Sequence, residues 1–141
     1  MRIWGLHASL GRPSEIERIG LRFINRIQLP GGKIDLGDFL ETAPKPPRDV
    51  NLPIIEFLHK DSFVVPDTSF QINIVRTLQR PSNPETRNYA IILDIDVYSH
   101  EAISPDTDTI KERLDYMRKL KNHVFVGSIT SALYDNLLGG S

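Results

Sequence analysis

The stretch NYAIILDIDVYSH, residues 88–100, decides the fold because apolar side chains recur at every second position along it. Tyr89, Ile91, Leu93, Ile95 and Val97 fall on one side, and Ala90, Ile92, Asp94, Asp96, Tyr98 and His100 fall on the other. Successive side chains of a strand point to opposite faces, so this period of two predicts a β-strand. One face of the strand is apolar, and the other carries two carboxylates and ends in a histidine.

A second stretch, residues 16–29, has the same period. The apolar side of this stretch holds Ile19, Leu21, Phe23, Ile27 and Leu29, interrupted by Asn25. Its polar side holds Arg18, Arg22, Arg26 and Gln28, and Pro30-Gly31-Gly32 ends it. This pattern is typical of a half-buried strand that is stopped by a turn.

Two further segments complete the predicted sheet. Residues 70–79 alternate clearly, although Arg76 lies on the apolar side, and residues 53–65 favour a strand or a hairpin around Lys60-Asp61. Residues 1–13 have no clear period, so we leave them as a poorly defined N-terminal segment. Between the strands, DLGDFLET predicts a short helix with Asp35 as a possible N-cap, and APKPPRDVNLP predicts an extended connection.

Residues 105–138 are predicted to be helical. Asp106 or Thr107 suits the N-cap, and Ile110, Leu114 and Met117 are three or four residues apart. One straight helix over this span would be about 48 Å long at 1.5 Å per residue, which is long for a small domain. We therefore expect a bend or break in residues 122–127.

These segments predict a single α+β domain over residues 1–141. Strands that follow one another without intervening helices favour an antiparallel sheet. We expect about four strands within residues 14–100, packed through one face on a long C-terminal helix. The sheet and the helix would then bury each other's apolar surfaces.

Composition limits the classes of function. The chain has 141 residues, no cysteine, and 17 basic against 18 acidic residues, for a net charge of −1. The lack of cysteine excludes disulfides, iron–sulfur clusters, zinc thiolate sites and thiol nucleophiles, and fits a reducing compartment. No window approaches the ~20 apolar residues of a membrane helix. We expect a cytoplasmic protein that binds neither membrane nor, given its balanced charge, nucleic acid.

Three phrases, RIGLRFINRIQLP, ILDIDVY and HVFVGSITSAL, resemble an uncharacterised, sporadically distributed bacterial protein family. The resemblance covers residues 17–137, and its polar and glycine positions are Arg18, Gly20, Arg22, Asn25, Arg26, Asp94 and Asp96. Phe23 stands where the family has tyrosine. Members of the family are longer, with another strand-and-helix half before the arginine strand, so the resemblance implies that this chain corresponds to the C-terminal half. It implies no established activity, cofactor or partner.

The two charged rows predict a structural or interaction face. If the two strands are neighbours, Arg22 and Arg26 meet Asp94 and Asp96 as cross-strand pairs, each contributing about 0.2–1 kcal/mol. The planar guanidinium suits carboxylates in a bidentate arrangement. Asn25, the one polar residue on the apolar side of its strand, is included with this face; we expect its amide to satisfy the backbone of a loop or bulge, and a ligand contact is the alternative. A second copy or another protein domain would cover this face.

The alternative is a metal site on the same face. Asp94 and Asp96 are about 6.6–7 Å apart along a strand, and together with His100 they offer ligands for Mg²⁺ or Mn²⁺. This alternative predicts a divalent-metal-dependent hydrolase or nuclease. We expect instead a non-enzymatic, self-associating interaction or structural module without a cofactor, because the chain lacks the motifs of common nucleophilic, zinc-protease and phosphate-loop sites.

Overall fold

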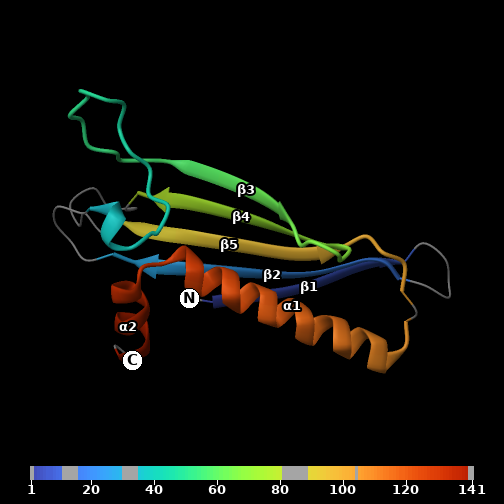
Figure 1. The fold of residues 1–141 in the computed structure, drawn as a ribbon. Helices are drawn as coiled ribbons and strands as arrows, with labels where there is room; N and C mark the ends of the chain where they lie inside the picture. The colour runs from blue at the N-terminus through green and yellow to red at the C-terminus, as the bar shows by residue number, and fades with distance from the viewer. Residues whose placement is uncertain (1, 11–15, 30–34, 81–88, 104, 140–141) are drawn as a thin grey trace.

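The structure is a computed structural model that describes residues 2–10, 16–29, 35–80, 89–103 and 105–139. Strands precede helices along the described chain (Figure 1). The elements are β1 (Arg2–Leu10), β2 (Ile16–Gln28), the 3₁₀ helix η1 (Leu36–Asp38), β3 (Leu58–Val64), β4 (Phe70–Gln79), β5 (Ala90–Ser99), α1 (Thr107–Ser128) and α2 (Ser131–Gly139). The predicted α+β class is confirmed.

The five strands form one antiparallel sheet in the order β1-β2-β5-β4-β3. Residues 88–100 contain the central strand, β5, which pairs with β2 on one side and β4 on the other. All four predicted strand segments contain a strand. In residues 53–65 it is the single strand β3 rather than a hairpin, and it starts only at Leu58.

The prediction for residues 1–13 was wrong, because they contain β1, a strand of nine residues. Trp4, Leu6, Ala8 and Leu10 do recur at every second position, but Gly5 and Ala8 are residue types with low strand propensity. Pairing with β2 decides the conformation: Trp4 lies opposite Phe23 in the register. The sheet therefore has five strands rather than about four.

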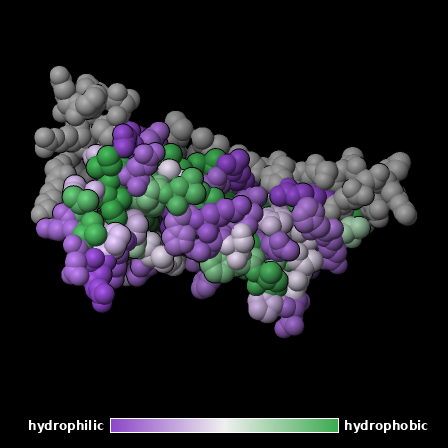
Figure 2. Space-filling model, turned by 90° about the horizontal axis from the view of Figure 1, so that it is seen from above, coloured by the Kyte–Doolittle hydropathy of each residue, from purple (hydrophilic) through white to green (hydrophobic). Residues whose placement is uncertain are grey.

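Residues 41–57 connect η1 to β3 without a described helix or strand of their own. The proline-rich composition predicted this for residues 43–53, whereas residues 54–57 were predicted as part of the strand or hairpin. The segment extends away from the sheet beside the start of β3 (Figure 1). Seen from above, hydrophobic residues gather at this end of the molecule (Figure 2). Within the segment, Leu52 and Ile55 are exposed.

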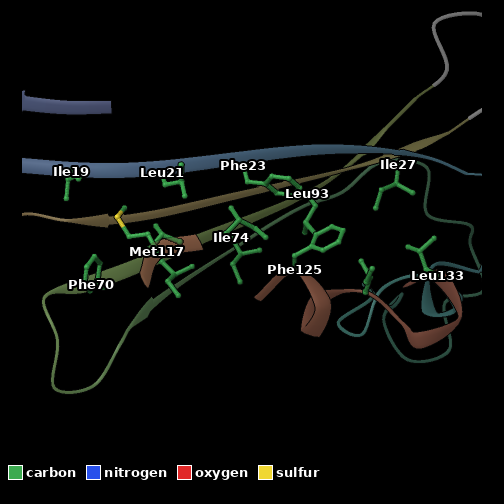
Figure 3. Packing of buried hydrophobic residues seen from close by; sticks show 14 of the residues in the cluster. Ile19, Leu21, Phe23, Ile27, Phe70, Ile74, Leu93, Met117, Phe125 and Leu133 are labelled. Carbon is green, nitrogen blue, oxygen red and sulfur yellow. The ribbon is translucent and has the colours of Figure 1, made fainter. Parts of the chain in front are cut away.

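One face of the sheet packs on α1 (Figures 1 and 3). Figure 3 shows the sheet side chains directed toward Met117 and Phe125 of the helix, with Leu133 of α2 beside them. Phe125 contacts Phe23 edge-on, with ring centroids 5.5 Å apart. The buried apolar residues of this layer include Ile19, Leu21, Phe23, Ile27, Phe70, Ile72, Ile74, Leu93, Ile95, Val97, Met117 and Phe125.

The helical region begins as expected but breaks later than expected. Asp106 is the N-cap of α1, and its carboxylate accepts a hydrogen bond from the Thr109 amide at 3.2 Å. The predicted break in residues 122–127 is wrong: α1 continues to Ser128, and the chain turns at Ile129 and Thr130. Ile129 forms a β-bridge with Leu40, and the Thr130 amide donates to the Phe39 carbonyl at 2.9 Å. These long-range hydrogen bonds hold the turn, together with a local cap, in which the Thr130 hydroxyl accepts from the Leu133 amide at 3.2 Å.

Asp35 caps η1 as predicted, because its carboxylate accepts a hydrogen bond from the Gly37 amide at 3.0 Å. This short helix lies next to the turn between α1 and α2: the Thr130 hydroxyl donates to the Asp38 carbonyl at 2.6 Å. The connection after β2 is thus anchored to the end of α1. Among the described residues, no helix is both long and apolar enough to cross a membrane.

Candidate interaction face

The sheet face turned away from α1 carries both charged rows, and we call it the open face. Its register follows from the strand pairing: Arg22 lies opposite Asp96, and Ile24 lies opposite Asp94. On the other side of β5, Asn73 and Val75 lie opposite the two aspartates. The members from β2, β5 and β4 are Arg18, Gly20, Arg22, Ile24, Arg26, Gln28, Ala90, Ile92, Asp94, Asp96, Tyr98, Gln71, Asn73, Val75, Thr77 and Gln79.

Arg22 and Asp94 form a bidentate ion pair on this face. Arg22 Nε donates to Asp94 Oδ1 at 3.0 Å, and Nη2 donates to Oδ2 at 2.6 Å. The Arg22 side chain is 51% exposed and that of Asp94 is 19% exposed. The hydrogen bonds and charge of Asp94 raise the pKa of Arg22, with a smaller contribution from Asp96. The pair is diagonal, because the residue directly opposite Arg22 is Asp96.

Asp96 has a different cationic neighbour from the one that the sequence suggested. Arg18 Nη2 lies 3.7 Å from Asp96 Oδ2, and the Arg18 guanidinium lies over the Tyr98 ring, 4.9 Å from its centroid. Sequence reasoning placed Arg18 on the polar side of β2 but did not include it in the site. The signal was present, since Arg18 is four residues before Arg22 and therefore on the same side of the strand.

Arg26 also lies on the open face, but its hydrogen bonds to described residues run to glutamine side chains. Its Nε donates to Gln79 Oε1 at 2.8 Å, and its Nη1 donates to Gln28 Oε1 at 3.1 Å. In the register, Arg26 lies opposite Ile92 and is diagonal to Asp94, just as Arg22 is, but Asp94 is bound by Arg22. The expectation that Arg26 would bind the aspartates is corrected: Arg22 hydrogen-bonds Asp94, and Arg18 forms an ion pair with Asp96.

Sequence reasoning put Asn25 on the apolar side of its strand but counted it among the residues of the interaction face, and this assignment is wrong. Asn25 is an odd-numbered residue of β2, like Phe23 and Ile27, and all three lie on the face that packs on α1. Its side chain is buried, with 5% of the residue exposed. Asn25 is therefore part of the buried layer and not a contact residue of the open face.

The three predicted metal ligands do not come together as a set. His100 follows the end of β5, and its ring contacts Tyr98 edge-on at a centroid distance of 5.6 Å. Both oxygens of Asp94 accept hydrogen bonds from Arg22. In the described part of the chain, no group of three or more histidine, aspartate or glutamate side chains is arranged to hold a metal ion. The metal-dependent hydrolase stays a prediction without a geometric observation in its favour.

The face that packs on α1 holds a second arginine–aspartate pair, which sequence reasoning missed. Arg76, whose side chain is 6% exposed, donates from Nη1 to Asp61 Oδ2 at 2.9 Å. His59 Nε2 lies 3.2 Å from the other oxygen, Asp61 Oδ1. The hydrogen bond from Arg76, assisted by His59, lowers the pKa of Asp61, and partial desolvation opposes this effect. Two features of the sequence indicated this pair: Arg76 lies on the apolar side of its strand, and His59 and Asp61 are two residues apart and therefore on the same face of theirs.

A pocket of about 660 Å³ opens where residues 43–55 pass over η1 and the ends of β4 and β5. Its wall is mostly apolar and includes Leu36, Pro53, Ile54, Leu78 and Tyr89. Asp35 and Lys45 are its charged residues. None of the residues predicted from the sequence to form a site lines this pocket, because the segment above it was read only as a connection.

Comparison with protein-family models, with curated proteins and with solved structures finds no match for this chain. The suggested membership of the sporadically distributed bacterial family therefore stays a prediction.

Proposed function

We propose that the chain is a non-enzymatic interaction module of the cytoplasm that self-associates through the open face. The observation that carries this proposal is the arrangement of charge on two adjacent strands. The β2 row holds three arginines, Arg18, Arg22 and Arg26, and the adjacent β5 row holds Asp94 and Asp96. Neighbouring strands are about 4.8 Å apart, so a basic line runs directly beside an acidic line.

Such a face is complementary to a second copy of itself. If two copies stack face to face about an axis parallel to the strands and between β2 and β5, the basic row of each lies over the acidic row of the other. Stacked sheets pack about 10 Å apart, which suits long arginine side chains. Opposite charges across an interface then fix its register and disfavour other partners.

Apolar side chains on the same face add a hydrophobic contribution. Ile24, Val75 and Ile92 surround the charged rows and are half-buried in the single chain. Burial of apolar area contributes about 25 cal/mol per Å², whereas exposed ion pairs alone contribute little. The apolar residues would supply affinity, and the charges would supply orientation.

The test is the molecular mass in solution, measured by light scattering at several protein and salt concentrations. A dimer or larger assembly, against a chain mass of 16.0 kDa, is expected for the wild type at low salt. Asp94→Asn should lower the melting temperature and shift the mass toward the monomer. Its matched control is Asp115→Asn, which removes a carboxylate from an exposed pair with Arg118 on α1 and should change neither.

A wild-type chain that stays monomeric at every concentration would refute the proposal. The same samples test the metal alternative. If Asp94, Asp96 and His100 held Mg²⁺ or Mn²⁺, either ion would raise the melting temperature and Asp94→Asn would abolish the gain. On the interaction proposal, the melting temperature does not respond to these ions or to EDTA.

A further inference from the structure

Strand β3 forms one edge of the sheet, and its backbone is paired on one side by β4. The Leu78 amide donates to the Phe57 carbonyl, and the Val65 amide donates to the Phe70 carbonyl. These bonds flank the strand and place its odd-numbered residues in the hydrogen-bonded pairs with β4. Because such pairs alternate in an antiparallel ladder, the even-numbered residues direct their N–H and C=O groups outward. They are Leu58, Lys60, Ser62 and Val64.

The outward-directed residues include two large exposed apolar side chains. Leu58 is 70% exposed and Val64 is 69% exposed, and they stand at the two ends of the strand. A row of outward backbone groups flanked by apolar side chains is a template for another strand. Lys60 is the one charged residue among the four outward-directed positions.

We propose that two copies of this chain pair through β3 in an antiparallel register centred on Asp61. In this register Leu58 of each copy lies opposite Val64 of the other, and Lys60 lies opposite Ser62. All four outward-directed residues then occupy hydrogen-bonded pairs, and the exposed apolar side chains meet on the same face of the joined sheet.

The neighbouring antiparallel registers satisfy fewer of these groups. A slip that places Lys60 opposite the Lys60 of the other copy sets like charges together and leaves Val64 beyond the paired region. A slip in the other direction places Ser62 opposite itself and leaves Leu58 unpaired. The register centred on Asp61 is favoured because Leu58 and Val64, the apolar residues at the two ends of the strand, are each three residues from Asp61.

The charges at the centre of this interface are balanced within each copy. The two Asp61 carboxylates lie opposite one another, which by itself is unfavourable. Each carboxylate already accepts a hydrogen bond from Arg76 of its own chain and lies 3.2 Å from His59. In the proposed register, His59 of each copy is also diagonal to Asp61 of the other, so two carboxylates share two guanidinium groups and two imidazoles.

This contact is independent of the open face. Pairing about an axis perpendicular to the sheet joins two five-stranded sheets side by side, with the α1 helices of both copies on one side. The open faces then lie together on the other side. Edge pairing therefore extends the open face rather than covering it, and each contact is tested by different residues.

The absence of cysteine in the chain makes disulfide trapping unambiguous. Directly opposed, hydrogen-bonded residues have Cα atoms about 5.5 Å apart, which is within the range for a disulfide. A mixture of Leu58→Cys and Val64→Cys chains should give a covalent dimer under mild oxidation. Each variant alone should give little dimer, because its two cysteines would be about 20 Å apart along the joined strands.

A second pair of variants tests the backbone hydrogen bonds between the two β3 strands without introducing cysteine. Lys60→Pro deletes an outward N–H that β4 does not use, whereas Lys60→Ala keeps it. The proline variant should lose edge-paired dimers in cross-linking with a bifunctional reagent, and the alanine variant should keep them. Equal trapping in the single-cysteine samples, or no trapping in the mixture, would refute the proposal.

The same experiment separates this proposal from the proposed function. Asp94→Asn, introduced into both cysteine chains, should leave the disulfide-trapped dimer unchanged if edge pairing is real. A loss of trapping with Asp94→Asn would show that association depends on the open face, and would refute independent edge pairing. Trapping that survives while light scattering shows no open-face assembly would refute the proposed function alone.

Discussion

The two faces of the central strand differ in what covers them and in what they carry. On the side that packs on α1, Ile91, Leu93, Ile95 and Val97 have no exposed surface. On the open face, Ile92, Asp94, Asp96 and Tyr98 alternate with them and remain partly exposed. The comparison shows that a period of two separates a packing surface from a polar surface within ten residues.

Each face also holds an arginine–aspartate pair, and the two pairs are built differently. Arg22 is half exposed and binds Asp94 through two parallel hydrogen bonds near the middle of the open face. Arg76 is buried, and its carboxylate partner Asp61 lies at the edge strand. Among the described atoms, Arg76 Nε has no hydrogen-bond partner. A buried guanidinium depends on its one carboxylate more than an exposed one does.

The largest loss of stability is expected when a buried side chain on the face that packs on α1 is truncated. Ile95→Ala should lower the free energy of unfolding by about 2–5 kcal/mol, because the site is fully buried between the sheet and α1. Urea unfolding monitored by circular dichroism measures it. The matched control is Ile92→Ala, on the open face of the same strand, for which a smaller loss is expected. Equal losses would mean that the open face is covered as fully as the other.

The buried pair gives the next effect. Asp61→Ala leaves the buried guanidinium of Arg76 without its carboxylate and should lower the melting temperature. Arg76→Met replaces the charge with an apolar side chain of similar length and should lower it less. The control is Glu56→Ala, which removes the carboxylate of the exposed Arg80 pair and should have little effect. If Arg76→Met lowered the melting temperature more than Asp61→Ala, the ion pair would contribute more to stability than the neutralisation of a buried charge.

The same pair predicts a pH dependence. Because the pKa of Asp61 is lowered in the folded state, the folded chain binds fewer protons than the unfolded chain. The pair's contribution is therefore fully present above the unfolded pKa of about 3.9, and is lost as the pH falls through the lower, folded value. Urea midpoints of the wild type and Asp61→Asn should converge over that range. Parallel curves for the two proteins would contradict the assignment.

The smallest effect is expected from the exposed pair. A double-mutant cycle with Arg22→Gln and Asp94→Asn should give a coupling energy of about 0.2–1 kcal/mol for the isolated chain, decreasing with salt. The measurement uses dilute protein, at which self-association is absent. A coupling above this range would mean that the pair is shielded from water even in the single chain.

Much of the sheet could be predicted because β2, β4 and β5 each pack one face on a helix, and burial on one face imposes the period of two on the sequence. The edge strand β1 was missed although Trp4, Leu6, Ala8 and Leu10 keep that period, because Gly5 and Ala8 lower the strand propensity of the segment. The turn at Ile129 and Thr130 was misplaced because its position depends on a long-range hydrogen bond to Phe39 and a bridge to Leu40, and because the one local signal, Thr130 as the cap of α2, was not used.

For the candidate site, the sequence predicted only which face of its strand each residue lies on. Sequence alone assigned Arg22, Arg26, Asp94 and Asp96 to polar positions, but not the partner of each charge. Which arginine meets which aspartate depends on the stagger of β2 against β5, and a diagonal offset gave Asp94 to Arg22 and brought Arg18 to Asp96.

The alternation of apolar and polar residues by itself determined that this chain forms an antiparallel sheet with one face for a helix and one for charged side chains. The physical reason is local, since side-chain direction along a strand depends only on the backbone period. The tertiary structure alone decided strand order, the pairing of each charge and the open edge at β3. These depend on contacts between segments that are far apart in the chain, for which the sequence carries no local signal.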